Sequence, residues 1–166
     1  MKQLITVLTV LIALTGCSPQ DPISNDTPEA LGRTIIRAFQ NDDKELFQRF
    51  VYTRNEVDHI LENDTKGIKD PEREISRFEE YRPQLIEAFE RIKSDADQKG
   101  LTSWEDVQFS QVRYKEKSKD LIAYNCQIEF TNGEFVGTIG LQTIYRSDNG
   151  WFMVGLPQFG RYVRRP

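Results

Sequence analysis

The stretch Leu121-Ile122-Ala123-Tyr124-Asn125-Cys126-Gln127-Ile128-Glu129-Phe130 alternates between apolar and polar side chains. The odd-numbered residues Asn125, Gln127 and Glu129 are polar, whereas Ala123 is not. The even-numbered residues are Ile122, Tyr124, Cys126, Ile128 and Phe130. Successive side chains of a strand point to opposite faces of a sheet, so this pattern predicts a strand with one buried face. Asn132-Gly133 follows, and because both residues tolerate positive φ they predict a two-residue hairpin turn.

The predicted turn fixes the pairing of the two strands that flank it. It places Phe130 opposite Phe135, Cys126 opposite Ile139 and Tyr124 opposite Leu141. A second reversal at Ser147-Asp148-Asn149-Gly150 predicts a third strand, from Trp151 to Leu156, with its even-numbered residues inward. The resulting inner face carries Tyr124, Cys126, Phe135, Gly137, Ile139, Leu141, Thr143, Tyr145, Phe152 and Val154. The outer face carries Val136, Ile144 and Met153, which makes it a candidate homodimer surface.

Helical patterns occupy the chain before this meander. Thr27 and Pro28 predict a first helix start, Asn41-Asp42-Asp43 separates a second helix, and Thr53-Arg54-Asn55-Glu56 matches a capping box. A longer apolar period begins at Asp70-Pro71 and ends at Lys99-Gly100, with Pro83 predicting a kink or two abutting helices. A weaker strand is predicted from Val107 to Tyr114. The sequence therefore predicts an α+β fold in which N-terminal helices pack on a curved, cone-like antiparallel sheet of about four strands. Residues 27–166 form one domain.

The amino terminus has the pattern of an export signal. Met1-Lys2-Gln3 is a short basic start, and the apolar run from Leu4 to Leu14 is too short for the roughly 20 residues of a spanning helix. The run ends in Leu14-Thr15-Gly16-Cys17, which resembles the lipobox of bacterial lipoproteins. An ordinary secretory signal with an incidental cysteine is the alternative.

This resemblance implies cleavage between Gly16 and Cys17 and acylation of Cys17, so that residues 1–16 are a signal peptide. Two or three acyl chains anchor a protein stably to a membrane. In Gram-negative lipoproteins an aspartate after the cysteine favours the inner membrane, whereas this chain has Ser18. We therefore expect the protein in the outer membrane facing the periplasm, on a polar tether formed by residues 17–26.

Charge and cysteine content exclude several classes of function. The 166 residues carry a formal net charge of −4, which removal of Lys2 makes one unit more negative, so nucleic acid is not an expected partner. With Cys17 acylated, Cys126 has no partner for an internal disulfide. We expect Phe159 and Tyr162 to pack on the sheet while the C-terminal arginines face water; a partner or phosphate contact is the alternative.

Helices followed by a strongly alternating meander, with Asn132-Gly133 at one turn and Asp148-Asn149-Gly150-Trp151 at another, resemble the nuclear transport factor 2-like superfamily. The similarity spans about Thr27 to Leu156. It implies a curved sheet wrapped around helices to form a cone. Members of the superfamily that have this cone are enzymes, small-ligand binders or interaction domains. The chain differs in one respect, because members commonly have a strand between the second and third helices, whereas residues 53–99 here have a helical pattern.

The inner face carries no acid or base, so we expect no catalytic residue. Tyr124 and Tyr145 define a candidate pocket there, although a packed interior is the simpler interpretation. His59, the only histidine, follows Asp58 on a predicted helix, but adjacent helical positions do not face each other, and we expect His59 to point to solvent. No metal site and no cofactor are expected, since one histidine and one buried thiol cannot form a zinc shell.

Two functions remain after these exclusions. The first is a non-enzymatic, acyl-anchored envelope lipoprotein that binds a protein partner or envelope component near its membrane. The alternative is a small-ligand binder or cavity enzyme of the nuclear transport factor 2-like superfamily.

The acyl anchor can be tested through Cys17. We expect Cys17→Ser, or treatment of cells with globomycin, to leave the chain unprocessed, because both prevent cleavage before the acylated cysteine. Immunoblots of membrane and soluble fractions would follow the change in size and partitioning. Unchanged processing and membrane partitioning of Cys17→Ser would contradict the prediction.

Overall fold

Helices and strands are segregated along the chain in the computed structural model, which describes residues 22–63, 71–117 and 121–165. The helices come first. They are α1 (Pro28–Gln40), α2 (Lys44–Gln48), α3 (Arg54–Asn63) and α4 (Pro71–Gln98). The antiparallel strands follow as β1 (Gln108–Lys117), β2 (Ile122–Asn132), β3 (Phe135–Ser147), β4 (Gly150–Met153) and β5 (Gln158–Arg164). The predicted α+β class is confirmed. β1 runs past the predicted end at Tyr114, and β5 is a strand that the sequence pattern did not predict.

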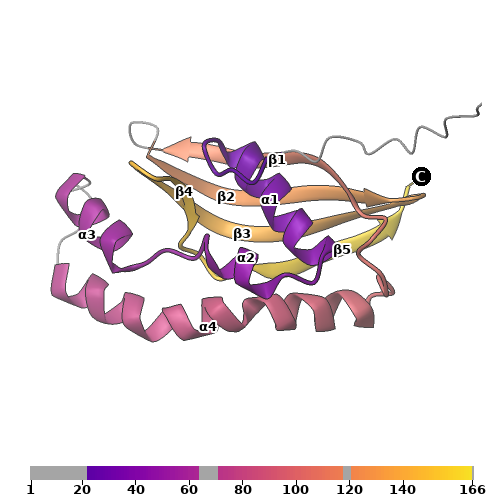
Figure 1. The fold of residues 1–166 in the computed structure, drawn as a ribbon, viewed down its shortest axis with the longest axis horizontal. Coiled ribbons are helices and arrows are strands. Elements are labelled where there is room, and N and C mark those ends of the chain that lie inside the picture. The colour runs from indigo at the N-terminus through magenta and orange to yellow at the C-terminus, as the bar shows by residue number, and fades with distance from the viewer. Residues whose placement is uncertain (1–21, 64–70, 118–120, 166) are drawn as a thin grey trace, which may run out of the picture.

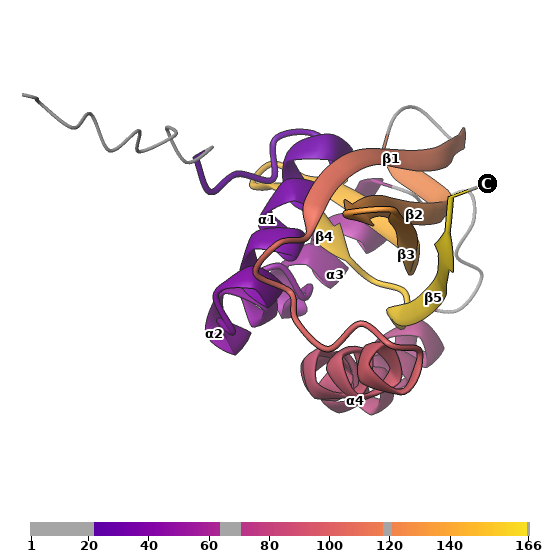
Figure 2. The same cartoon turned by 90° about the vertical axis from the view of Figure 1, so that its right-hand side faces the viewer.

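The sheet curves around the helices. Its strand order is β1-β2-β3-β4. β4 and β5 pair with the same edge of β3, β4 along residues 144–147 and β5 along residues 135–140. Figure 1 shows α1 crossing the sheet and α4 running below it, and the end-on view of Figure 2 shows the sheet bending over both helices. The core lies in this concave space, where Phe39 of α1 stacks on Phe89 of α4 and on Trp104.

The predicted helix caps are present. The Thr27 side chain accepts a hydrogen bond from the third residue of α1 at 3.0 Å, and Asp43 does the same for α2 at 2.8 Å. At the start of α3, the Thr53 backbone N–H donates to the Glu56 carboxylate at 2.7 Å, as in a capping box. α4 continues through Pro83 as one helix, so the prediction of two abutting helices is wrong.

The domain begins earlier than its first helix. The backbone N–H of Trp151 donates to the Asn25 carbonyl at 2.8 Å, and the Asn25 side chain donates to the Trp151 carbonyl at 3.0 Å. Ser24 is hydrogen-bonded to Thr34 of α1 in both directions. Ser24 and Asn25, which belong to the predicted tether, are therefore hydrogen-bonded to the domain. Residues 1–21, including the predicted signal and Cys17, lie outside the described part of the chain.

The predicted inner face of the hairpin is confirmed in its central part. Cys126, Ile128, Ile139 and Leu141 are completely buried, whereas Gln127 and Gln142 are exposed. The alternation of apolar and polar side chains therefore identified which face of the sheet meets the helices.

The predicted register of the hairpin is wrong by two residues. Asn132 pairs with Phe135, so Gly133 and Glu134 form the turn, and Phe130 lies opposite Gly137 rather than opposite Phe135. The Phe130 ring occupies the space that a side chain at position 137 would need, because a Cβ there would lie 2.1 Å from Phe130 Cζ. Since side chains alternate with a period of two, this shift does not by itself move any side chain between Cys126 and Leu141 to the other face.

Paired irregularities then interrupt β2 and β3. Asn125 and Gln142 have left-handed backbone conformations, with φ of 52° and 60°. Cys126 pairs with Gln142 instead of the predicted Ile139, and Tyr124 pairs with Thr143 instead of the predicted Leu141. Each strand therefore has one unpaired residue. An unpaired residue in a strand reverses the parity of the side chains that follow.

This reversal overturns the prediction of an outer apolar face. Ile144 and Met153 pair with each other and are completely buried, together with Ala123. Val136 alone of the three predicted residues is partly exposed. Tyr145 and Phe152, the neighbours of Ile144 and Met153, are also buried, so this end of the sheet is covered on both faces. Ile144 and Met153 therefore cannot form a dimer surface.

The last two strands share β3. β4 ends at Met153 instead of the predicted Leu156, because the chain turns at Gly155, whose N–H donates to the Thr143 carbonyl at 3.0 Å. A Cβ at position 155 would lie 2.7 Å from the Leu141 carbonyl oxygen, so only glycine fits beside the irregularity. The chain then pairs with β3 again as β5, which buries Phe159 in the core.

The contact between Phe130 and Gly137 predicts an asymmetry between two glycines of β3. We expect Gly137→Ala to lower the free energy of unfolding by about 1–3 kcal/mol, because the new methyl group would displace the Phe130 ring. Gly140→Ala should have little effect, since its nearest neighbour would lie 3.9 Å away. Urea unfolding would measure both variants, and equal stability of the two would contradict the assigned register.

Candidate functional site

A cavity of about 640 Å³ lies between α3, the first half of α4 and the end of the sheet where both faces are covered. Its walls are mainly apolar and aromatic, with a few polar groups. They are Tyr52, Val57, Ile60, Leu61, Arg77, Phe78, Tyr81, Leu85, Ile122, Tyr124, Gln142, Thr143, Tyr145, Val154, Gly155 and Leu156. Apolar walls with a few placed polar groups are typical of small-ligand sites.

The two tyrosines of the candidate pocket both line this cavity, but they differ in exposure. Tyr145 is 1% exposed, whereas Tyr124 is 37% exposed. The left-handed conformation at Asn125 separates Tyr124 from the buried face of Cys126 and Ile128 and turns it toward the cavity. Tyr81 of α4 is equally exposed, so aromatic rings from a helix and from the sheet both reach the cavity and solvent.

His59 is placed differently from our prediction. Its Nδ1 lies 3.1 Å from the Tyr145 hydroxyl, and its side chain is only 23% exposed. The prediction of a solvent-facing His59 is wrong because its partner comes from β3, far away in the sequence. One local signal pointed to this outcome, since the capping box holds Glu56, one turn earlier, in a buried position.

Asp148 extends this contact into a short polar series. Its carboxylate lies 3.6 Å from His59 Nε2, which is an electrostatic contact rather than a hydrogen bond. A neutral His59 with its proton on Nε2 can accept from the Tyr145 hydroxyl and face the Asp148 carboxylate at the same time. This arrangement fixes the direction of the Tyr145 phenol at the cavity wall.

One charged residue lines the cavity among those that the structure describes, and it is Arg77. Its guanidinium carbon lies 5.6 Å from the centre of the Tyr81 ring, four residues along α4. The sequence did not point to Arg77. The periodic spacing of apolar residues in α4 predicts which of its side chains are buried, and it gives no information about a charged residue next to them.

Other chemical groups contribute less to a site. Burial raises the pKa of the Cys126 thiol to about 12, and the nearby Glu29 adds to this effect, so Cys126 stays protonated and unreactive. Glu129, also buried, is bound by Arg113 at 2.9 Å and Gln111 at 2.6 Å. Within the described residues, no cluster of three or more histidine, cysteine or acidic side chains is arranged to hold a metal ion.

Comparisons with protein-family models, with curated proteins and with solved structures gave no match to this chain. The resemblance to the nuclear transport factor 2-like superfamily therefore stays a prediction. In the part of the chain that the structure describes, no helix has the length and apolar character needed to cross a membrane.

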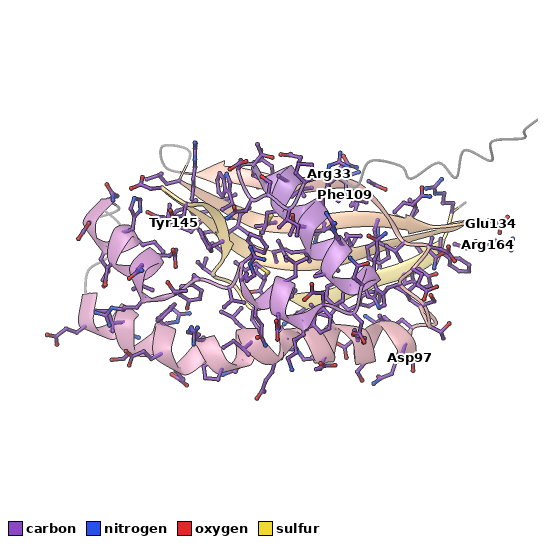
Figure 3. All side chains as sticks on the ribbon, viewed as in Figure 1. Arg33, Asp97, Phe109, Glu134, Tyr145 and Arg164 are labelled. Carbon is purple, nitrogen blue, oxygen red and sulfur yellow. The ribbon has the colours of Figure 1, made fainter. Side chains whose placement is uncertain are left out.

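The contact of Tyr145 with His59 can be measured as a coupling (Figure 3 labels Tyr145 at the end of the sheet near α3). We expect Tyr145→Phe to lower the free energy of unfolding by about 1 kcal/mol, as loss of one buried hydrogen bond does. A double-mutant cycle with His59→Ala, measured by urea unfolding, should give a coupling of similar size. Asp148→Asn should change stability little, because the Asp148 side chain is 93% exposed. Additive effects of Tyr145→Phe and His59→Ala on the free energy of unfolding would show that their hydrogen bond does not form.

Proposed function

We propose that this protein is an acyl-anchored envelope lipoprotein whose domain binds a small, largely apolar ligand in the cavity between α3, α4 and the sheet. The observation that supports the proposal is the cavity itself, which both tyrosines of the candidate pocket line. Its volume of about 640 Å³ lies within the range of about 300–1,000 Å³ that small-ligand sites have. This observation favours the small-ligand hypothesis over the interaction domain.

The cavity suits binding better than catalysis. A general acid or base must lie within hydrogen-bonding reach of its substrate. No carboxylate and no histidine is among the described residues that line the cavity, and His59 lies behind Tyr145. The walls offer aromatic surface, hydroxyl groups and one guanidinium, which are groups that hold and orient a ligand.

The anchor and the domain are compatible parts of this proposal. The predicted acylation at Cys17 would leave only a few residues between the membrane and Ser24, which is hydrogen-bonded to α1. Each residue spans at most about 3.3 Å, so the cavity would stay within a few nanometres of the bilayer surface. A domain held there can collect or deliver an apolar compound that is poorly soluble in water.

Binding can be tested with Nile red, a neutral apolar dye whose fluorescence rises in apolar surroundings. We expect saturable binding to the full chain carrying Cys17→Ser, and loss of at least tenfold in affinity in Leu61→Trp, because the larger ring would occupy part of the cavity and narrow it between α3 and the other walls. Ile23→Trp is the matched control, since Ile23 is 44% exposed and does not line the cavity. Equal affinity of Leu61→Trp and Ile23→Trp would contradict binding in the cavity.

A further inference from the structure

We infer that the cavity binds an amphiphile with a single negative charge, a long-chain monocarboxylate, and that the carboxylate lies against Arg77. This inference rests on the proposed function and specifies its ligand. The observation behind it is the charge of the cavity. Arg77 alone is charged among the described lining residues, and an acidic side chain is not among them.

Arg77 makes no ion pair with any residue that the structure describes. Other arginines of this acidic chain are paired: Arg54 contacts Asp58 at 2.9 Å, Arg113 contacts Glu129 at 2.9 Å, and Arg164 contacts Glu134. Arg77 instead has its guanidinium near the face of Tyr81. A guanidinium carries five donors, and a ring face satisfies none of them by a hydrogen bond, so they stay available to an anion.

Tyr81 also keeps Arg77 at the edge of the cavity. An arginine over an aromatic ring loses fewer conformations when it binds, because the cation–π contact already restricts it. Tyr81, which lies beside Arg77, is 37% exposed, so this part of the cavity wall borders solvent. A charged headgroup bound there stays partly hydrated and avoids the cost of full burial.

The rest of the cavity suits an apolar chain. Val57 and Leu61 of α3 and Phe78 and Leu85 of α4 all line it, and Phe78 and Leu85 are at most 6% exposed. Each methylene that leaves water contributes about 0.8 kcal/mol, so a long alkyl chain gains affinity along these walls. The cavity thus offers one cation and an apolar wall, the two features that an amphiphile requires.

The number of charges favours a carboxylate over a phosphate monoester. One guanidinium can form two parallel hydrogen bonds with a carboxylate and balance its single charge. A phosphate monoester carries nearly two negative charges at neutral pH, and no second cation lines the described part of the cavity.

The inference can be tested by displacement of Nile red from the full chain carrying Cys17→Ser. The competitors are dodecanoate, dodecanol and dodecyl phosphate, which share one chain length. We expect dodecanoate to bind about tenfold more tightly than dodecanol, as charge-assisted hydrogen bonds provide, and this preference should vanish in Arg77→Gln. Arg82→Gln is the matched control, because it removes the same charge from α4 at a residue outside the cavity lining.

Each outcome separates this inference from the proposed function. Saturable Nile red binding with equal displacement by dodecanoate and dodecanol would overturn the inference and leave small-ligand binding in place. A preference for dodecanoate that survives in Arg77→Gln would also overturn it, as would tighter binding of dodecyl phosphate than of dodecanoate. Absence of saturable Nile red binding would instead contradict the proposed function. A preference lost in Arg77→Gln and kept in Arg82→Gln would establish the carboxylate site.

Discussion

The left-handed backbone at Asn125 and Gln142 determines how the sheet is covered. The two residues lie next to each other on β2 and β3, with Cys126 paired to Gln142. A left-handed conformation costs a non-glycine residue roughly 1–2 kcal/mol. Burial of Ala123, Ile144 and Met153, all 0% exposed, offsets this cost, since each large apolar side chain contributes about 1.5–3 kcal/mol.

The change of face accounts for the cavity at this end of the sheet. At Ile128 and Ile139 the face toward the helices is completely buried, and α1 packs directly on it at Gly32, where a Cβ would lie 2.5 Å from Val112. Beyond the paired irregularities, Ile144 and Met153 are buried on one face and Tyr145 and Phe152 on the other, and α3 with the first half of α4 lines the cavity beside Tyr145. Side chains from these separate elements meet at Tyr145 without filling the space between them, and the cavity is that space.

What the sequence could predict depended on the range of the interaction concerned. Caps at Thr27, Asp43 and Thr53 were predictable because each bond closes within three residues. That Cys126 and Ile128 lie on the buried face of the sheet was predictable from the alternation of apolar and polar residues alone. The register was not, because the fit of the Phe130 ring over Gly137 decided it against an equally plausible turn. Arg77 and His59 were missed for a related reason, since their surroundings come from the assembled fold.

The β3–β4 turn connects the tether with the cavity wall. Asn25, at the start of the described domain, donates to the carbonyls of Asn149 and Trp151. Asp148 of the same turn faces His59, which contacts Tyr145 in the cavity wall. The turn therefore contacts both the start of the described domain, through Asn25, and His59, which is the partner of the Tyr145 hydroxyl.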